Sequence, residues 1–414
     1  MLCGGTRLQD VDRLRHDVPL MNGLGARLLP DPTTTGDFLR RFTEADLLAL
    51  MDAVNSVRPK LWRGRGADLF GEVAYLDVDA TIVATTGELK QGMDISYKGV
   101  WGYAPLLVTL ANTREVLYLV NRPGNAPSHL DAATWIDKAI DLVAPHAKRV
   151  CLRGDTDFAL TAHFDRWAAG VDFVLGTDNI AALRSRAEAL PESAWTRLAR
   201  PAPYENKTGT TRSRRHNRKQ EVITQRGFVN LRLNHEDVAE FTYRPGKCQR
   251  DYRVVVLRKN ISRTKGEDVL IDEIRYFFYF TTYPAATHTP ARIVALANQR
   301  CDQENILGQL KSGINALHAP VEDLHSNWAY MLIAALAWNI KSWHAMMSHR
   351  KADRAGFIRM EFKRFLDTVI RIPATIIVRA RGITVRLLAY TVNLDRFFTA
   401  WATTERIRFD ARYG

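Results

Sequence analysis

Glu72-Val-Ala-Tyr-Leu-Asp-Val-Asp79 alternates between two kinds of side chain along its length. In an extended chain Tyr75, Asp77 and Asp79 share one face, and the aliphatic side chains between them share the other. The alternation predicts a β-strand that packs its aliphatic face on a core. It also brings two carboxyl groups to the end of that strand.

The elements expected after this strand alternate in type. Two strands, a helix, a strand, a short helix and a strand are predicted at 105–110, 115–120, 128–143, 149–155, 162–169 and 171–175. An antiparallel meander extended by crossover units is typical of a ribonuclease-H-like mixed sheet. We therefore expect an α/β fold with such a core.

The stretch 291–311 is rich in Ala, Leu, Gln and Asn and predicts one helix. At about 100° per residue, Arg300, Glu304 and Lys311 fall within roughly 40° of one another. The opposite flank is apolar and is expected to be buried; it comprises Ile293, Val294, Leu296, Ile306, Leu307 and Leu310. A solvent-exposed helix with an ordinary Arg–Glu pair is the alternative.

Aspartates also end two of the predicted strands, Asp79 on the first and Asp155 on the fourth. Together with Glu304 they would form a cluster of three carboxylates, the ligand type that Mg²⁺ prefers. Two such ions about 4 Å apart are suited to phosphodiester chemistry, and Mn²⁺ is an alternative. Asp77 and Asp157 compete with Asp79 and Asp155, and spacing alone does not separate them.

Asp155 and Glu304 are too far apart in sequence for a single loop, so an inserted domain is expected between them. Alternating aromatic and β-branched residues predict strands in the insertion, and 212–219 is a dense basic run. Interleaved bases and aromatics favour a sheet that grips DNA; a sheet with a solvated charged face is the alternative.

The predicted regions are five. They are a helical N-terminal region at 1–68, the first part of the core at 69–180, a β-rich insertion at 181–286, closing helices of the core at 287–345 and a helical C-terminal region at 346–414. Within the first region, 30–36 is expected to be a turn in which a threonine caps the next helix.

The amino-acid composition indicates a class of binding partner and a cellular compartment. Lysine and arginine number 58 against 45 acids, a net charge of +13, which indicates a polyanionic partner. Four scattered cysteines favour neither a zinc site nor disulfides and fit a reducing cytoplasm. The apolar run 328–340 is too short to span a bilayer and predicts a buried helix.

Two loops near the first strands are candidates for contact with nucleic acid. The stretch 90–103 contains Lys90 and is rich in glycine, basic and aromatic residues, although an ordinary long hairpin is the alternative. The stretch 121–125 places Arg122 before a crossover helix, where a structural turn is equally expected. No Gly-x-x-x-x-Gly-Lys motif is present, which disfavours an ATP-driven enzyme.

These motifs together resemble bacterial insertion-sequence transposases of the DDE class, and within them the thirteen-eighty branch with its Tyr-Arg-Glu-Lys signature. That branch is related to hairpin-forming cut-and-paste transposases. The resemblance is carried by the stretches 77–81, 90–92, 102–107, 122–125, 153–155 and 298–305.

The resemblance implies roles for individual residues. Asp79, Asp155 and Glu304 match the catalytic, Mg²⁺-binding acids. The expected DNA- or phosphate-binding residues are Arg300, Lys311, Lys90, Arg122 and Arg153, and Tyr283 is a candidate for stacking a flipped base. The signature tyrosine is replaced by Ala297, which is a departure from the family.

The resemblance also implies a function and partners. It predicts metal-dependent cleavage and strand transfer of an insertion sequence, acting as a homodimer on terminal inverted repeats and target DNA in a bacterial cytoplasm, associated with the nucleoid. A DNA-binding protein that no longer cuts, and a nuclease that hydrolyses without strand transfer, are the alternatives.

Overall fold

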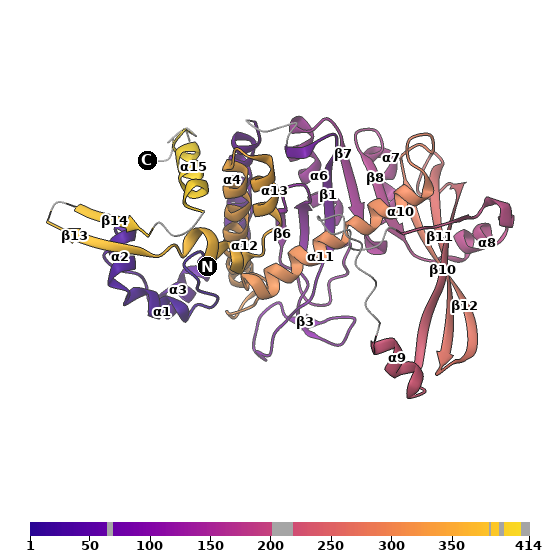
Figure 1. The fold of residues 1–414 in the computed structure, drawn as a ribbon, viewed down its shortest axis with the longest axis horizontal. Helices are drawn as coiled ribbons and strands as arrows, with labels where there is room; N and C mark the ends of the chain where they lie inside the picture. Colours follow the sequence, from indigo (N-terminus) through magenta and orange to yellow (C-terminus); the bar gives the residue numbers. More distant parts are fainter. Residues whose placement is uncertain (64–68, 201–217, 381, 389–392, 407–414) are drawn as a thin grey trace. The chain divides into compact units, whose positions relative to one another are not determined.

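The computed structural model describes residues 1–63, 69–200, 218–380, 382–388 and 393–406. The chain divides into two compact units (Figure 1). The first consists of Met1–Leu152 and Arg300–Gly414, and the second of Arg153–Gln299. These boundaries do not coincide with those of the five predicted regions, which stay predictions.

The sheet of the first unit has the predicted meander. Strand β1 (Ala74–Ala80) pairs antiparallel with β5 (Leu106–Leu110), which pairs antiparallel with β6 (Glu115–Val120). Strand β7 (Val150–Gly154) follows β1 in the sheet order β6-β5-β1-β7. Every residue of β5 and β6 is buried, so this part of the sheet is covered on both faces.

Helices supply that cover. The amphipathic helix α6 (Ala132–Val143) contacts β1, β5 and β6, whereas α4 (Glu44–Arg63) and α12 (Leu324–Met347) contact β6. The predicted mixed α/β class is confirmed. The finer, ribonuclease-H-like assignment stays a prediction.

The predicted N-terminal helices are present as α1 (Asp10–Arg15), α2 (Val18–Leu24), α3 (Pro32–Leu39) and α4. The expected threonine cap was wrong. Helix α3 begins at Pro32, inside the predicted turn, and the Asp31 carboxylate caps it by accepting a 2.7 Å hydrogen bond from the Thr34 amide. Proline at the first helical position leaves the cap to the residue before it.

A buried polar junction joins α4, β6 and α12. The fully buried guanidinium of Arg58 on α4 forms an ion pair with the Glu115 carboxylate at the start of β6. That carboxylate also accepts hydrogen bonds from the indole nitrogens of Trp62 and Trp343, at 3.1 and 2.7 Å, and from the Thr113 hydroxyl at 2.6 Å. Three elements are thereby joined through one acid.

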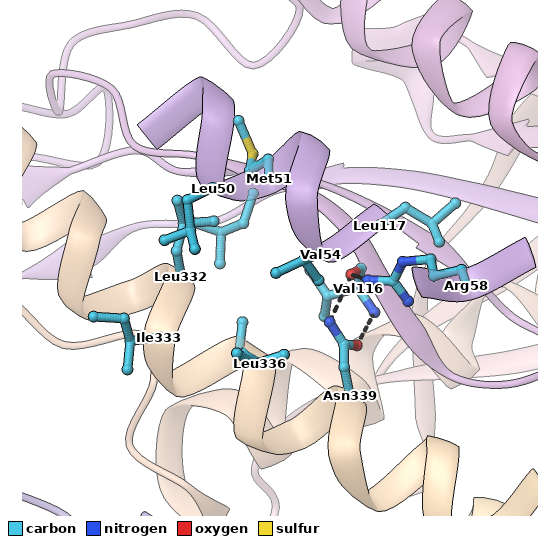
Figure 2. Close-up of a pocket in the computed structure, with 12 residues that line it drawn as sticks. Leu50, Met51, Val54, Arg58, Val116, Leu117, Leu332, Ile333, Leu336 and Asn339 are labelled. Atoms are coloured by element: carbon cyan, nitrogen blue, oxygen red, sulfur yellow. Dashed lines mark hydrogen bonds between the residues drawn. The ribbon is translucent and has the colours of Figure 1, made fainter. Parts of the chain in front are cut away.

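The neighbouring contact between these elements is shown in Figure 2. The Asn339 side chain of α12 accepts a hydrogen bond from the Val116 amide at 2.8 Å and donates one to the Val116 carbonyl at 3.0 Å. Leucines and Met51 line the apolar pocket beside it. Helix α12 therefore contacts β6 through hydrogen bonds between the Asn339 side chain and the strand backbone, as well as through apolar packing.

The apolar run 328–340 lies in α12, as predicted, and is mostly buried. Its two tryptophans, Trp328 and Trp338, donate their indole N–H groups to the carbonyls of Leu119 and Arg114, both at 2.6 Å. None of the described helices has the length and apolar character needed to cross a membrane.

The wholly helical C-terminal region was wrong in part. Helices α13 (Lys351–Arg359), α14 (Phe362–Phe365) and α15 (Leu394–Glu405) are present, with a π-turn at Leu366–Ile370. A hairpin of β13 (Ala374–Arg379) and β14 (Gly382–Leu387) lies among them. Its run Thr-Ile-Ile-Val is β-branched throughout, which favours a strand over a helix.

The second unit is dominated by long strands. Its sheet order is β8-β12-β11-β10-β9, with β8 (Asp172–Thr177), β9 (Thr196–Arg197), β10 (Val229–Tyr243), β11 (Tyr252–Lys265) and β12 (Asp268–Thr281). Helix α10 (Pro290–Gln299) packs on this sheet, and α7 (Phe164–Trp167), α8 (Ala181–Glu188) and α9 (Arg218–Gln225) complete the unit. The predicted strands of the insertion are confirmed and are longer than expected.

The single helix predicted at 291–311 is interrupted. Helix α10 ends at Gln299, α11 (Cys301–Gly308) begins after Arg300, and a π-turn follows at Gln309–Gly313. The predicted apolar flank is confirmed, because all six of its side chains are buried. Periodicity thus identified the packed face but not the interruption.

The junction at Glu115 yields a stability prediction. In Glu115→Ala the Arg58 guanidinium stays buried without its carboxylate, which should cost about 3–5 kcal/mol of unfolding free energy. Thermal and urea unfolding of the full chain would measure this loss.

Glu72→Ala is the matched control, since Glu72 is exposed and pairs with Lys148 at the surface. It should cost under about 1 kcal/mol. Equal effects of the two substitutions would contradict the importance assigned to the junction.

Candidate functional site

The site in the first unit is centred on Asp79, near the end of β1. The Arg300 guanidinium donates from Nη1 to Asp79 Oδ2 at 3.1 Å, and the Ala80 amide donates to Oδ1 at 2.8 Å. The side chains of Asp79 and Arg300 are 13% and 17% exposed. A largely desolvated acid is therefore held against a fixed positive charge.

A second contact fixes α11 against this strand. The buried side chain of Gln303 donates from Nε2 to the backbone carbonyl of Asp77 at 3.1 Å. Arg300 lies one turn before Gln303, so this bond sets the position from which Arg300 reaches Asp79. Sequence reasoning missed Gln303, whose only signal was its spacing of three residues from Arg300.

Lys311 reaches the same end of β1 from the π-turn Gln309–Gly313. Its ammonium group donates to the Thr81 hydroxyl at 2.6 Å. Burial lowers the pKa of Lys311, and the negative charge of Asp79 opposes that shift. The two predicted bases, Arg300 and Lys311, are thus both placed at the end of the strand that carries Asp79.

Glu304, the third member of the predicted helix face, is exposed. It makes no ion pair or side-chain hydrogen bond with other described residues. The pair predicted by helical spacing is therefore not formed, because Arg300 binds Asp79 instead. Glu304 keeps a solvated carboxylate one turn from Arg300.

Asp155 belongs to the second unit, directly after β7. Its carboxylate accepts a 3.2 Å hydrogen bond from the Asp157 amide and caps the short 3₁₀ turn Thr156–Phe158. Asp155 is half-buried and Asp157 is exposed. In the first unit, Asp77 is fully buried whereas the Asp79 side chain keeps a small exposed fraction, which favours Asp79 as the functional acid of β1.

Carboxylate oxygens are suitable donors for Mg²⁺, and Asp79 and Glu304 both supply them. Across the described ranges, no three His, Cys, Asp or Glu side chains are grouped so as to hold a metal ion. The Asp79 carboxylate has a guanidinium as its neighbour in this structure.

Arg122, which was predicted as a phosphate ligand, has backbone carbonyls as its partners in this structure. Its side chain is buried, and its Nε donates to the Ala104 carbonyl at 2.9 Å. Its Nη1 donates to the carbonyls of Pro127, Ser128 and Leu130 at 3.3, 3.1 and 2.8 Å. Burial lowers the pKa of Arg122 to about 10. The guanidinium organises the loop before α6 and is not presented to a ligand.

Arg153, which was predicted to bind DNA, is likewise buried against backbone. It is 2% exposed and donates to the Leu296 carbonyl at 3.3 Å within the second unit. Lys90 is half-buried and donates to the Ala319 carbonyl, and desolvation lowers its pKa. Its ammonium group is therefore committed to a backbone partner in this conformation.

The stacking role predicted for Tyr283 does not match the structure. The ring is 1% exposed and stacks on His288, with 4.0 Å between the ring centroids. A base would have to displace His288 and open this packing before it met the tyrosine. In this conformation the Tyr283 ring is therefore not exposed for stacking, and its predicted role stays a prediction.

Several bases of the second-unit sheet are paired with acids. Arg200 bonds Glu236, Arg253 bonds Glu240, and Arg258 lies 3.2 Å from Asp237. These pairs favour the solvated-face alternative for this part of the sheet. The basic run 212–219 lies outside the described residues, apart from its last two positions.

The first unit is thus a mixed α/β domain that gathers an acid and two bases at the end of one strand. A family model described as Transposase DDE domain group 1 matches residues 1–408, so the chain belongs to that family of transposases.

A solved structure described as a piggyBac transposase synaptic complex with hairpin DNA is similar to the chain, with a TM-score of 0.33 and 10% sequence identity. The alignment covers 82% of this chain and 59% of the piggyBac chain. No curated protein matches.

Substitution by methionine should lower the free energy of unfolding much more at Arg122 than at Lys311. Arg122→Met removes a buried guanidinium that donates to four backbone carbonyls, of which that of Ala104 is buried, so a loss of about 3 kcal/mol or more is expected. Lys311→Met removes an exposed cation with one side-chain hydrogen bond, so the expected change is under about 1 kcal/mol.

Urea denaturation of the two variants would test this contrast. Similar unfolding midpoints for Arg122→Met and the unmodified chain would restore Arg122 as a candidate ligand.

Proposed function

We propose that this chain is a DDE transposase of a bacterial insertion sequence, of the branch with the Tyr-Arg-Glu-Lys signature. On this proposal the first unit contributes to a ribonuclease-H-like catalytic core. The observation that supports it most is the placement of Arg300 and Lys311 at the end of the strand that carries Asp79, in a chain of the transposase DDE domain family.

Asp79, Asp155 and Glu304 are proposed as the acids that hold two Mg²⁺ ions. Bound Mg²⁺ would lower the pKa of a water molecule and stabilise the oxygen that leaves phosphorus. Asp79 supports this role because its side chain is partly exposed, whereas that of Asp77 is fully buried. Glu304 supports it because it is exposed and makes no ion pair or side-chain hydrogen bond with the described residues.

Arg300 and Lys311 are proposed to bind phosphate oxygens beside the scissile bond. Arg300 now compensates the charge of Asp79, and its planar guanidinium is suited to exchange that carboxylate for a phosphate. Lys311 holds a second positive charge nearby through Thr81. Fixed charges of this kind stabilise a transition state in which negative charge grows on the phosphate.

The proposed reaction begins with water attacking phosphorus at the end of the element, which breaks the P–O3′ bond and frees a 3′-hydroxyl group. That hydroxyl then attacks the opposite strand to give a hairpin and releases the flanking DNA. A second water molecule opens the hairpin, which frees the 3′-hydroxyl again, and this hydroxyl attacks target DNA. In each attack one P–O bond forms as another breaks, so no covalent protein intermediate is needed. Cut-and-paste transposition is the resulting function.

Partners follow from the same proposal. The substrate is DNA, as terminal inverted repeats and as target, which is consistent with the net charge of +13. Two ends must be processed together, so we propose a homodimer in the DNA complex. The proposed site of action is the nucleoid of a bacterial cytoplasm.

Ala297 favours a second candidate function. It occupies the signature tyrosine position, so a hydroxyl contact to phosphate is absent from that position. A DNA-binding relative that no longer cuts is therefore the alternative, as is a nuclease that cuts without joining. A precut 3′-hydroxyl end supplied with a target plasmid separates them by joining, cutting only, or neither.

Substitution of the acids tests the proposed chemistry. Asp79→Asn, Asp155→Asn and Glu304→Gln should each lower Mg²⁺-dependent cleavage of DNA from the ends of the element on the order of a hundredfold or more. Cleavage would be measured on labelled duplexes taken from the sequence that flanks the coding region.

Asp157→Asn is the matched control, because Asp157 is an exposed acid two residues from Asp155. It should retain activity. Unchanged activity in Asp155→Asn, combined with loss in Asp157→Asn, would transfer the role to Asp157; full activity in all three acid variants would refute the mechanism.

A further inference from the structure

A pocket of about 330 Å³ lies beside Lys311 within the first unit. Its walls come from the end of β1 and the residues after it, from a small hairpin, and from the loop that precedes α6. The lining residues that matter for its chemistry are Thr81, Tyr97, Lys98, Ser128 and Lys311. A pocket of this size can take a ligand as large as a nucleotide.

The hairpin is the one given as the alternative for 90–103, and it belongs to a three-stranded sheet that was not predicted. It has the order β2-β4-β3, with β2 (Val83–Ala84), β4 (Trp101–Tyr103) and β3 (Asp94–Ile95). Gly102 packs so closely that a Cβ atom would lie 2.1 Å from the Val83 carbonyl oxygen. A Cβ on Gly124 would lie 2.2 Å from the Asp94 carbonyl oxygen. Only glycine fits either position, so backbones pack directly and support the pocket.

The turn of the hairpin presents Tyr97 and Lys98 to solvent. The Gly99 amide donates to the Ser96 carbonyl at 2.8 Å, and the Val100 amide donates to the Ser96 hydroxyl at 3.1 Å. Gly99 has a φ of 72°, which favours glycine at this position. The turn is thus well specified, and yet it leaves the Tyr97 ring 82% exposed.

Lys98 gives this turn its charge. The Lys98 ammonium group lies 5.2 Å from the centroid of the Tyr97 ring. Lys98 and Lys311 line the same pocket, and their mutual repulsion adds to the desolvation that lowers the pKa of Lys311. The described lining contains no acidic side chain. An anion entering the pocket would relieve the repulsion between the two cations.

We propose that this pocket binds an unpaired nucleotide of a DNA strand, with its phosphate between Lys98 and Lys311 and its base stacked on Tyr97. The inference rests on the proposed function and specifies how a DNA end is positioned there. Lys311 also contacts Thr81, two residues after Asp79, so the bound nucleotide lies next to the candidate catalytic acid.

The base must be unpaired because both faces of a base inside a duplex are covered by its neighbours. An exposed tyrosine can stack on a base only when one of those faces is free. The combination of two cations with one aromatic ring matches a phosphate joined to a base more closely than it matches a free phosphate ion. Tyr97, Lys98 and Lys311 are therefore positioning residues for an end that has lost its pairing.

Binding of the full-length chain to fluorescent DNA tests the proposal. The probe is a duplex with 2-aminopurine as an unpaired terminal nucleotide, in EDTA so that no cleavage occurs, and a fully paired blunt duplex serves for comparison. Tyr97→Ala should weaken binding of the unpaired end about fivefold or more, with blunt-duplex affinity within about twofold of the unmodified chain. The fluorescence quenching caused by stacking should also be lost.

Tyr97→Phe is the matched control, since it keeps the ring and removes only the hydroxyl group; it should retain both affinity and quenching. Lys98→Gln should weaken binding of the unpaired end while leaving quenching of the bound fraction in place. Tyr97 is exposed, so all three variants should unfold at the temperature of the unmodified chain.

The outcomes separate this inference from the proposed function. If the unmodified chain cuts DNA but Tyr97→Ala binds both probes normally and still quenches, the nucleotide pocket is refuted and the transposase proposal stands. If the unmodified chain binds neither DNA probe, both fail. If Tyr97→Ala weakens binding of single-stranded RNA but not binding of the DNA probe, the assignment to DNA is also refuted.

Discussion

The buried carboxylate of Glu115 is the constraint on which the first unit depends. It takes an ion pair from Arg58 of α4 and a hydrogen bond from Trp343 of α12, at the first residue of β6. Desolvation lowers the pKa of Arg58, and the Glu115 charge opposes that shift, so neither residue is stable there alone. Strand β6 continues into β5, and β5 pairs Leu107 with Asp79 on β1. The position of Asp79 on β1 therefore depends, through β5, on the packing of α4 and α12 against β6.

The two cations of the site, Arg300 and Lys311, differ in the partner that holds them. Arg300 is held by the carboxylate that a ligand would compete for, so it must change partner for the site to act. Lys311 bonds a hydroxyl group and keeps its ammonium group at the edge of a pocket, so it needs no such exchange. Gln303 has neither charge nor exposure, yet its bond to the Asp77 carbonyl determines where Arg300 lies. The geometry of the charged residues is thus set by an uncharged one.

The sequence predicted elements well where burial is periodic. The strand at 72–79, the meander after it and the apolar flank of 291–311 all follow from alternating or helical spacing, and all are present. It failed where two environments have the same local pattern. Arg122 precedes a Pro-Gly-Asn stretch that could be read as a phosphate-binding turn, but its partners are carbonyls that the fold brings close to it. The sequence around Tyr283 and Tyr97 does not reveal which ring is exposed. Tertiary packing buries the first and leaves the second exposed.

Exposure of Tyr97 is not a consequence of weak local structure. The turn that carries it is fixed by Ser96 and Gly99, and the sheet beneath it depends on close approach of backbones at Gly102 and Gly124. An aromatic ring in contact with water contributes nothing to folding through burial. A ligand with an apolar face and a negative charge would gain both the uncovered ring and the two lysines, and an unpaired nucleotide has both features.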